Sequence, residues 1–222
     1  MRFRAVHVVL VAGLASALAA CASTPPSVPS AADGTGPVAY FLGDSWTAGL
    51  GADPDRVYAH VASEQLGWQP VIDAISGTGY LTRSAPGFES FPVRAERIED
   101  GEDIDFVVVQ GSINDTAYDL APLPQEARRV IAAVQERAPD ATLVLLGPGP
   151  ASLPMSPDLR EIDRVLAAEA ERAGVAYVPM LPWFTEDSID EIIGATSYHP
   201  TTEGNEILGE RLVEALRAQG IA

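Results

Sequence analysis

Five short segments of this 222-residue chain are almost wholly apolar, and longer stretches with helical periodicity separate them. A short apolar run bounded by turn residues is typical of a strand that is buried on both faces. Such strands, alternating with amphipathic helices, indicate a parallel sheet covered on both sides. We therefore predict an α/β fold, a three-layer α/β/α sandwich around a parallel sheet of about five strands. The predicted strands are residues 38–42, 70–75, 105–110, 141–146 and 175–179.

The stretches between these strands have the hydrophobic spacing of helices that bury one face. The predicted helices are residues 56–66, 93–99, 125–138, a segment from 156 to the stop at 174, and a last one from about 202 to about 220. The helix that begins at Ser156-Pro157 has a favourable start. Its buried stripe is expected to contain Leu159, Ile162, Leu166 and Ala173. Residues 80–92 show no period and are predicted to form a surface loop near the edge of the sheet.

The N-terminus has the pattern of an export signal. Residues 1–4 are basic, and residues 6–20 are apolar over a length that suits a signal peptide and is short for a permanent membrane helix. The run closes on Leu18-Ala19-Ala20-Cys21, which resembles a bacterial lipobox, in which the cysteine is lipidated. The alternative is an ordinary cleaved signal followed by a chance cysteine. We expect an exported protein that is lipid-anchored at the cell envelope through Cys21, or secreted if Cys21 is not lipidated.

Three regions follow from this pattern: a signal peptide over residues 1–20, Cys21 with a flexible linker over residues 21–37, and one folded domain over residues 38–222. The linker is rich in Ser, Pro, Gly and Ala. Extended, it would reach up to roughly 50 Å, at about 3.3 Å per residue. Cys21 is the only cysteine, which excludes an intramolecular disulfide.

The charge balance excludes several kinds of partner. The net charge is −17 and the chain has no lysine, so electrostatic binding to nucleic acid or to an anionic lipid surface is not expected. Membrane contact is expected only through the N-terminal anchor. The acidic cluster at residues 96–105 is interpreted as a solvated loop or helix end, and no metal site is predicted. We expect a monomer.

Polar residues stand directly after several predicted strands. In open α/β sheets, ligands bind at the carboxyl ends of the strands. Ser45 follows the first strand, Gly77 the second and Asn114 the third, while His199 precedes the last helix. Together they would supply a nucleophile, oxyanion donors and a general base, the parts of an acyl-transfer site. Ser45 taken alone is equally well interpreted as a cap of the next helix.

The remaining polar and aromatic residues near this edge have other interpretations. Asp44 and Asp115 are expected to organise backbone amides rather than to perform chemistry. Six aromatic residues are candidates either for a substrate pocket or for packing. They are Trp46, Tyr80, Phe88, Phe91, Trp183 and Tyr198.

The order and content of these segments resemble the SGNH hydrolases, also called GDSL esterases or lipases. The matching blocks are Gly43-Asp44-Ser45, Gly77, Asn114-Asp115 and His199-Pro200. The resemblance extends over about residues 38–220. It implies the flavodoxin-like SGNH-hydrolase fold and a serine esterase that needs no cofactor.

The resemblance also implies a role for each residue. Ser45 attacks the acyl carbonyl and His199 takes its proton. The amides of Ser45 and Gly77, with the side chain of Asn114, hold the oxyanion. The substrate would be a small-molecule, glycan or lipid ester. The alternatives are a polysaccharide deacetylase or acyltransferase of the same family, and a catalytically degenerate binding lipoprotein.

Two positions depart from the family pattern. Ser112 stands where the third block usually has glycine, and we expect a modest change of loop shape. Thr196 stands where the family usually has the aspartate that orients the histidine. Either a backbone carbonyl near Thr196 orients His199, or a carboxylate from elsewhere does, or catalysis is impaired. The nearest upstream carboxylates are Asp187, Asp190 and Glu191.

Overall fold

A central sheet of five parallel strands organises the protein. The structure is a computed structural model and describes residues 36–82, 85–99, 103–194 and 198–222. The strands lie in the order β2-β1-β3-β4-β5, and each predicted strand is present with its ends shifted by one or two residues. Their bounds are β1 Val38–Gly43, β2 Gln69–Ala74, β3 Phe106–Gly111, β4 Thr142–Pro148 and β5 Ala176–Val178. The predicted signal peptide, Cys21 and the linker up to residue 35 lie outside the described residues and stay predictions.

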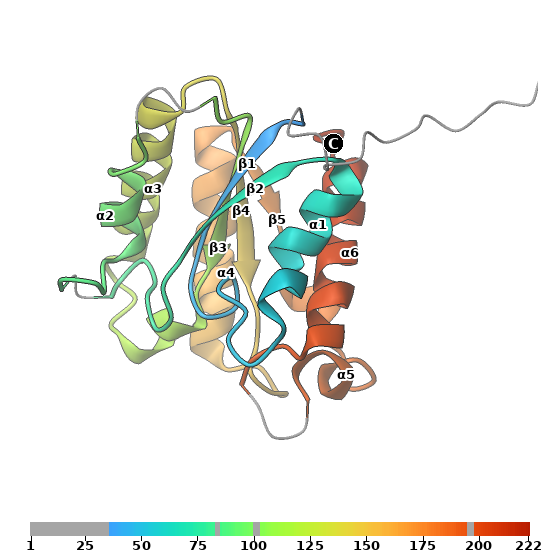
Figure 1. The fold of residues 1–222 in the computed structure, drawn as a ribbon. Coiled ribbons are helices and arrows are strands. Elements are labelled where there is room, and N and C mark those ends of the chain that lie inside the picture. Colours follow the sequence, from blue (N-terminus) through green and yellow to red (C-terminus); the bar gives the residue numbers. More distant parts are fainter. Residues whose placement is uncertain (1–35, 83–84, 100–102, 195–197) are drawn as a thin grey trace, which may run out of the picture.

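Helices cover both faces of this sheet, so the three-layer prediction is confirmed (Figure 1). One face carries α1 (Tyr58–Leu66), α5 (Ile189–Ile193) and α6 (Thr202–Ala218). The other carries α2 (Phe91–Ala95), α3 (Leu123–Arg137) and α4 (Pro157–Ala173). Short 3-10 turns lie at η2 (Pro54–Arg56), η3 (Ile113–Ala117) and η4 (Leu181–Trp183). Within the described ranges, no helix has both the length and the apolar character needed to cross a bilayer.

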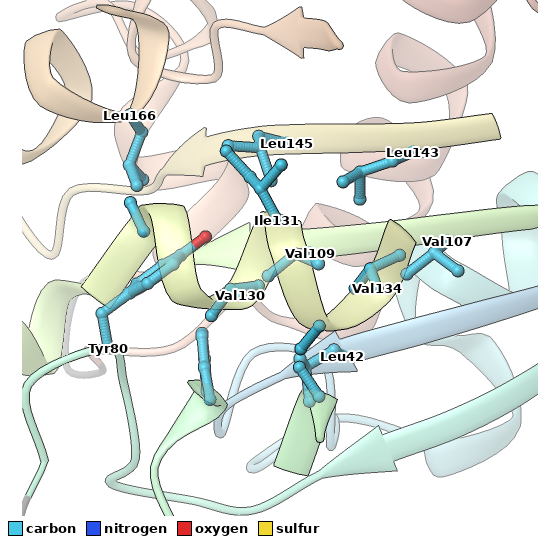
Figure 2. Packing of buried hydrophobic residues seen from close by; sticks show 14 of the residues in the cluster. Leu42, Tyr80, Val107, Val109, Val130, Ile131, Val134, Leu143, Leu145 and Leu166 are labelled. Carbon is cyan, nitrogen blue, oxygen red and sulfur yellow. The ribbon is translucent and has the colours of Figure 1, made fainter. Parts of the chain in front are cut away.

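Strands β1, β3, β4 and β5 contribute alternate residues to two separate cores, and the edge strand β2 contributes to one of them. Leu42, Val107 and Val109 pack with α3 in one core, while Phe41 and Val108 belong to the core on the opposite face. Figure 2 shows the first of these cores, with Val130, Ile131 and Val134 of α3 directed at the strands. Successive side chains of a strand point to opposite faces. This is why the strands read as continuous apolar runs rather than as alternating ones.

Local signals explain most helix ends. The Ser156 hydroxyl accepts a hydrogen bond from the Leu159 amide at 3.1 Å, and α4 stops at Gly174, whose φ of 68° is left-handed. Ala173 was expected on the buried stripe, but it is exposed, and Ala170 is buried instead. Ala170 stands four residues after Leu166 and continues its row along the helix. Ala173, seven residues after Leu166, lies on the same face but is the last residue of α4, where the buried row has ended.

Two expectations near the edge of the sheet are corrected. The helix expected over 93–99 is instead the shorter α2, which begins at Phe91 and buries Phe91 and Ala95. The segment from residue 80 is not wholly a surface loop, because Tyr80 is only 1% exposed. Its ring packs against Phe91 with the centroids 5.2 Å apart, so the start of this segment belongs to the core.

The strand order fixes where a site can form. The chain passes from β1 to β2 on one side and then to β3 on the other side of β1, so the order reverses between β1 and β3. In doubly wound sheets, ligands bind outside the carboxyl ends of the strands at such a reversal. The residues that follow β1 and β3 therefore lie side by side at the switch point.

Candidate active site

Ser45 and His199 meet at this edge. The Ser45 hydroxyl oxygen and His199 Nε2 are 2.9 Å apart, although 154 positions separate the two residues. Ser45 is 5% exposed and His199 is half-buried. The separation suits proton transfer between a hydroxyl and an imidazole. The residues after Ser45 form successive turns rather than a helix, so the interpretation of Ser45 as a helix cap is wrong.

Gly77 lies in the turn that follows β2, next to the end of β1. The two strands are in register up to Gly43 and Ala74, and the Ile75 amide donates to the Gly43 carbonyl at 3.2 Å. Gly77 has a φ of +78°, and a Cβ there would lie 2.9 Å from the ring of Phe88. Both the left-handed backbone and the close ring require glycine at this position.

Asn114, in η3 after β3, connects the segments that carry Ser45 and Gly77. Its Nδ2 donates to Asp44 Oδ2 at 3.2 Å and to the Thr78 carbonyl at 3.0 Å. Asp44 precedes Ser45 and Thr78 follows Gly77, so the carboxamide is fixed between the two segments. The structure thus brings the three strand-end segments together.

Ser112 lies at the centre of this arrangement. Its hydroxyl oxygen is 2.7 Å from Asp44 Oδ2 and 2.8 Å from the Thr78 carbonyl, and it accepts a hydrogen bond from the Asn114 amide at 3.1 Å. A hydroxyl has one proton, so it donates to one of the two oxygens at a time. We expected Ser112 only to change the loop shape; in the structure it binds all three segments.

Two buried carboxyl groups organise backbone amides, as expected. Asp44 accepts from the Trp46 amide at 2.9 Å, and Asp115 accepts from the amides of Tyr80 and Leu81 at 3.0 and 2.8 Å. Burial raises the pKa of Asp44, although hydrogen bonds and the nearby His199 oppose this shift. Burial also raises the pKa of Asp115, to about 7. Both carboxyls therefore hold the loops around the site at an electrostatic cost.

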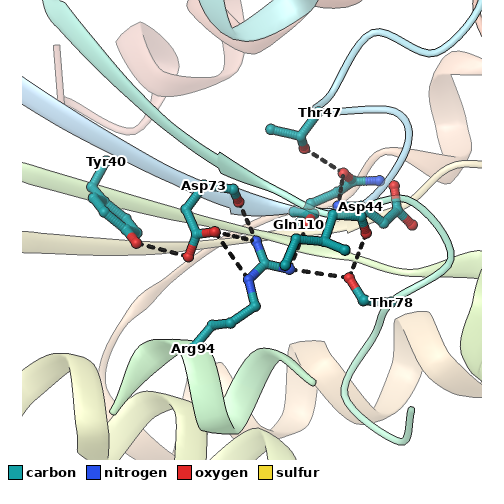
Figure 3. A network of polar contacts seen from close by, with 9 residues as sticks. Tyr40, Asp44, Thr47, Asp73, Thr78, Arg94 and Gln110 are labelled. Carbon is teal, nitrogen blue, oxygen red and sulfur yellow. Dashed lines mark hydrogen bonds and ion pairs between the residues drawn. The ribbon is translucent and has the colours of Figure 1, made fainter. Parts of the chain in front are cut away.

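A buried arginine was missed by the sequence analysis. Arg94 of α2 is 4% exposed, and its Nη1 donates to the Gly43 carbonyl and to Thr78 Oγ1, each at 3.0 Å. Its Nε donates to Asp73 Oδ1 at 3.0 Å, and Tyr40 donates to the same carboxylate at 2.8 Å (Figure 3). Arg94 therefore joins the end of β1 to the segment after Gly77. The available signal was a charged residue on the buried face of a helix, between two apolar positions.

Of the candidates for orienting His199, the structure describes the three carboxylates but not Thr196. Asp187 is exposed in the loop before α5, and Asp190 and Glu191 are exposed in the first turn of α5. Acidic residues in a first turn interact favourably with the helix dipole, which gives those two a local role. Thr196 lies outside the described residues, so the backbone-carbonyl hypothesis stays a prediction.

The six aromatic candidates divide between core and surface. Trp46, Tyr80 and Phe91 are buried, and Trp183 is partly buried. Phe88 and Tyr198 are 40% and 75% exposed, the first against Gly77 and the second next to His199. Among the residues that the structure describes, no three His, Cys, Asp or Glu side chains cluster as a metal site would require.

Comparison with known proteins gives one family match and several structural ones. The model of the GDSL-like lipase/acylhydrolase family matches residues 41–207. A GDSL lipase of Mycobacterium tuberculosis is 29% identical over 190 residues, which cover 79% of each chain.

The solved structures support the fold. An aryl esterase of Mycobacterium smegmatis superposes with a TM-score of 0.67 at 19% identity, over 82% of this chain and 99% of that one. The salicylyl-acyltransferase SsfX3 of a tetracycline biosynthetic pathway gives 0.63 at 22% identity, over 84% of this chain and 56% of that one. A carbohydrate acetylesterase of Sinorhizobium meliloti gives 0.64 at 14% identity, over 82% and 99%.

Proposed function

Because the chain belongs to the GDSL-like lipase/acylhydrolase family and is a serine hydrolase, we propose that it hydrolyses acyl or acetyl esters through an acyl-enzyme on Ser45. The observation that carries this proposal is the 2.9 Å separation between the Ser45 hydroxyl and His199 Nε2. A serine hydroxyl is a weak nucleophile until a neighbouring base removes its proton. The same contact argues against a degenerate binding protein.

Acylation begins when the Ser45 oxygen attacks the ester carbonyl carbon and His199 Nε2 takes the hydroxyl proton. The carbonyl oxygen becomes an oxyanion, which the amides of Ser45 and Gly77 and the Nδ2 of Asn114 stabilise. Asn114 Nδ2 carries two hydrogens, which bind Asp44 Oδ2 and the Thr78 carbonyl in the free enzyme. Donation to the oxyanion therefore requires that one of these two bonds is exchanged for the bond to the oxyanion. When the intermediate collapses, the bond to the alcohol breaks and His199 protonates the leaving oxygen.

Deacylation repeats these steps with water as the nucleophile. His199 takes a proton from water, the hydroxide oxygen attacks the acyl carbonyl, and the same donors hold the second oxyanion. Collapse releases the carboxylic acid and returns the proton to Ser45. An alcohol in place of water would give acyl transfer, which keeps an acyltransferase as one alternative. A polysaccharide deacetylase, the other alternative, would follow the same steps with water as nucleophile and a sugar hydroxyl as the leaving group.

The substrate is proposed to be a small-molecule, glycan or lipid ester. Phe88 lies against Gly77, so the part of the ester next to the oxyanion meets an aromatic ring. Tyr198 exposes a second ring beside His199. Among the structural neighbours, the acyltransferase is the precedent for another acyl acceptor, and the carbohydrate acetylesterase is the precedent for a carbohydrate ester as substrate.

The proposal is tested with the domain from residue 36 onward, a fluorophosphonate probe and short-chain p-nitrophenyl esters. We expect Ser45→Ala and His199→Ala to lose at least about 10⁴-fold in kcat. His60→Ala is the matched control, since His60 lies in α1, and it should retain activity. An unlabelled, inactive wild-type domain would refute the esterase.

Export and lipidation are proposed on the pattern of residues 1–21. We expect full-length protein expressed in a bacterium to fractionate with membranes, and Cys21→Ser to release it. Equal membrane retention of the two forms would exclude the lipid anchor.

A further inference from the structure

The consecutive residues Ser45 and Trp46 contact the consecutive residues Tyr198 and His199. Ser45 contacts His199 at 2.9 Å, and the next residue, Trp46, donates its Nε1 hydrogen to the main-chain carbonyl of Tyr198 at 3.3 Å. The nucleophile turn and the histidine segment are therefore joined at two neighbouring points. The first contact is part of the proposed chemistry, and the second is not.

The indole of Trp46 is held firmly. Its side chain is 1% exposed, and its ring packs against Phe184 with the centroids 5.9 Å apart. On another side it lies so close to Gly149 that a Cβ there would stand 2.0 Å from the ring. The Trp46 amide is also bound, to Asp44 Oδ1 at 2.9 Å. The direction of the Nε1 hydrogen is thus fixed by packing on both sides of the ring.

The two sides of His199 are held differently. On the C-terminal side, Pro200 is buried and Thr201 caps α6 by accepting from the Gly204 amide at 2.9 Å. Thr201 also donates its amide to the Ile192 carbonyl at 2.9 Å. On the N-terminal side, Tyr198 is 75% exposed, so its side chain contributes little packing. Its carbonyl is where the bond from Trp46 acts.

We propose that Trp46 is a positioning residue that holds the main chain at Tyr198 and thereby sets the distance from His199 Nε2 to Ser45. This role rests on the proposed function of Ser45 and His199. It gives the histidine segment a support that belongs to the nucleophile turn itself. A base displaced by about 1 Å costs up to about 10²-fold in rate. The effect falls on the chemical step, since Trp46 is buried and does not face the substrate.

The test compares Trp46→Phe with Trp68→Phe. Both substitutions replace an indole by a smaller phenyl ring in the same core and remove its N–H. Trp68 is the control because it is 3% exposed and stacks on Phe106 at 4.2 Å, away from Ser45. We expect Trp46→Phe to lower kcat and the rate of fluorophosphonate labelling about 10- to 100-fold, with KM changed less than about twofold. Trp68→Phe should keep kcat even with an equal loss in Tm. A kcat loss that is the same in both variants, or absent in Trp46→Phe, overturns the proposal.

A second variant guards against misfolding. Trp46→benzothienylalanine keeps the shape of the ring and replaces only the N–H by sulfur, and it should reproduce the fall in kcat. NMR of the His199 imidazole gives a readout without turnover: its signals should broaden in both Trp46 variants and stay sharp in Trp68→Phe. If the wild type is inert towards esters, the esterase fails, but this readout still decides the role of Trp46. Unchanged His199 signals in both Trp46 variants would overturn it.

Discussion

The serine side and the histidine side of the site are held in different ways. Ser45, Gly77 and Asn114 follow three neighbouring strands, and buried side chains link the three turns to one another. His199 lies beyond the sheet, between α5 and α6, and the contacts described around it act largely on the main chain. One side is cross-linked by polar side chains, whereas the contacts described for the other side include a helix start and one indole.

This difference predicts which substitutions lower the stability of the fold and which lower only the activity. Strands in register fix the proposed oxyanion donors before a substrate arrives, and such preorganisation makes donors effective. The polar groups that do so are buried, so removing one leaves its partners unsatisfied and costs folding free energy. Changes on the serine side should therefore lower stability together with activity, whereas a change of the His199 side chain should lower activity alone.

The largest effect is expected for Arg94→Met. The change leaves the Asp73 carboxylate and the Gly43 carbonyl without the guanidinium. Breaking a fully buried ion pair costs about 3–5 kcal/mol, which is the upper end for this pair because Asp73 is 26% exposed. Chemical denaturation would measure the loss. Arg164→Met is the matched control, because Arg164 pairs with Glu161 on the surface of α4 and should change stability by less than about 1 kcal/mol. Equal losses would contradict the view that Arg94 supports the serine side.

Asn114→Ala removes one proposed oxyanion donor and should lower kcat by about 10²–10³-fold, or about 3–4 kcal/mol. Stability should also fall, because Asp44 and the Thr78 carbonyl lose a donor. Steady-state kinetics and thermal unfolding of the same samples provide the comparison. A kcat within about fivefold of wild type would remove Asn114 from the oxyanion site.

Asp115 should make the free energy of unfolding depend on pH. Its folded pKa of about 7 lies above the unfolded value, so the folded state binds the proton more tightly. Its contribution to stability is full below about pH 4 and is lost as the pH rises to about 7, an effect on the order of 1 kcal/mol or more. Denaturation of wild type and Asp115→Asn from pH 4 to pH 8 should show a flatter curve for the variant. Parallel curves would mean that Asp115 is ionised throughout.

The smallest effect is expected for Phe88→Ala. The ring is 40% exposed and covers Gly77, so its removal should alter acyl preference rather than folding. We expect kcat/KM for hexanoyl relative to acetyl p-nitrophenyl esters to rise a few-fold. Tyr118→Ala, which removes another ring of 38% exposure, is the control. An unchanged preference in Phe88→Ala would place the acyl group elsewhere.

The elements could be predicted because their signals are local. The apolar runs identify the strands, and the polar residues that follow Leu42, Ala74 and Gly111 converge because parallel strands end at one edge. The supporting contacts could not be predicted in the same way. Arg94 binds a carbonyl 51 positions away, and Trp46 binds one 152 positions away. No local pattern specifies such pairs, since they depend on how separate elements pack.

The hypotheses about His199 show the same limit. Asp187, Asp190 and Glu191 were considered because they are near in sequence, and the structure places all three at the surface; which group orients His199 stays a prediction. Closeness along the chain does not determine where a side chain points. Trp46, which binds the Tyr198 carbonyl, lies 152 positions earlier in the sequence, next to Ser45.

The direction of β1 gives the molecule a polarity. The strand starts at Val38 and runs toward Ser45, so the described chain enters the domain at the pole opposite the site (Figure 1). Under the proposed lipidation of Cys21, the flexible linker would join the domain at the pole opposite Ser45. The attachment to the membrane would then not cover the edge of the sheet that carries Ser45, and the site would stay accessible to esters.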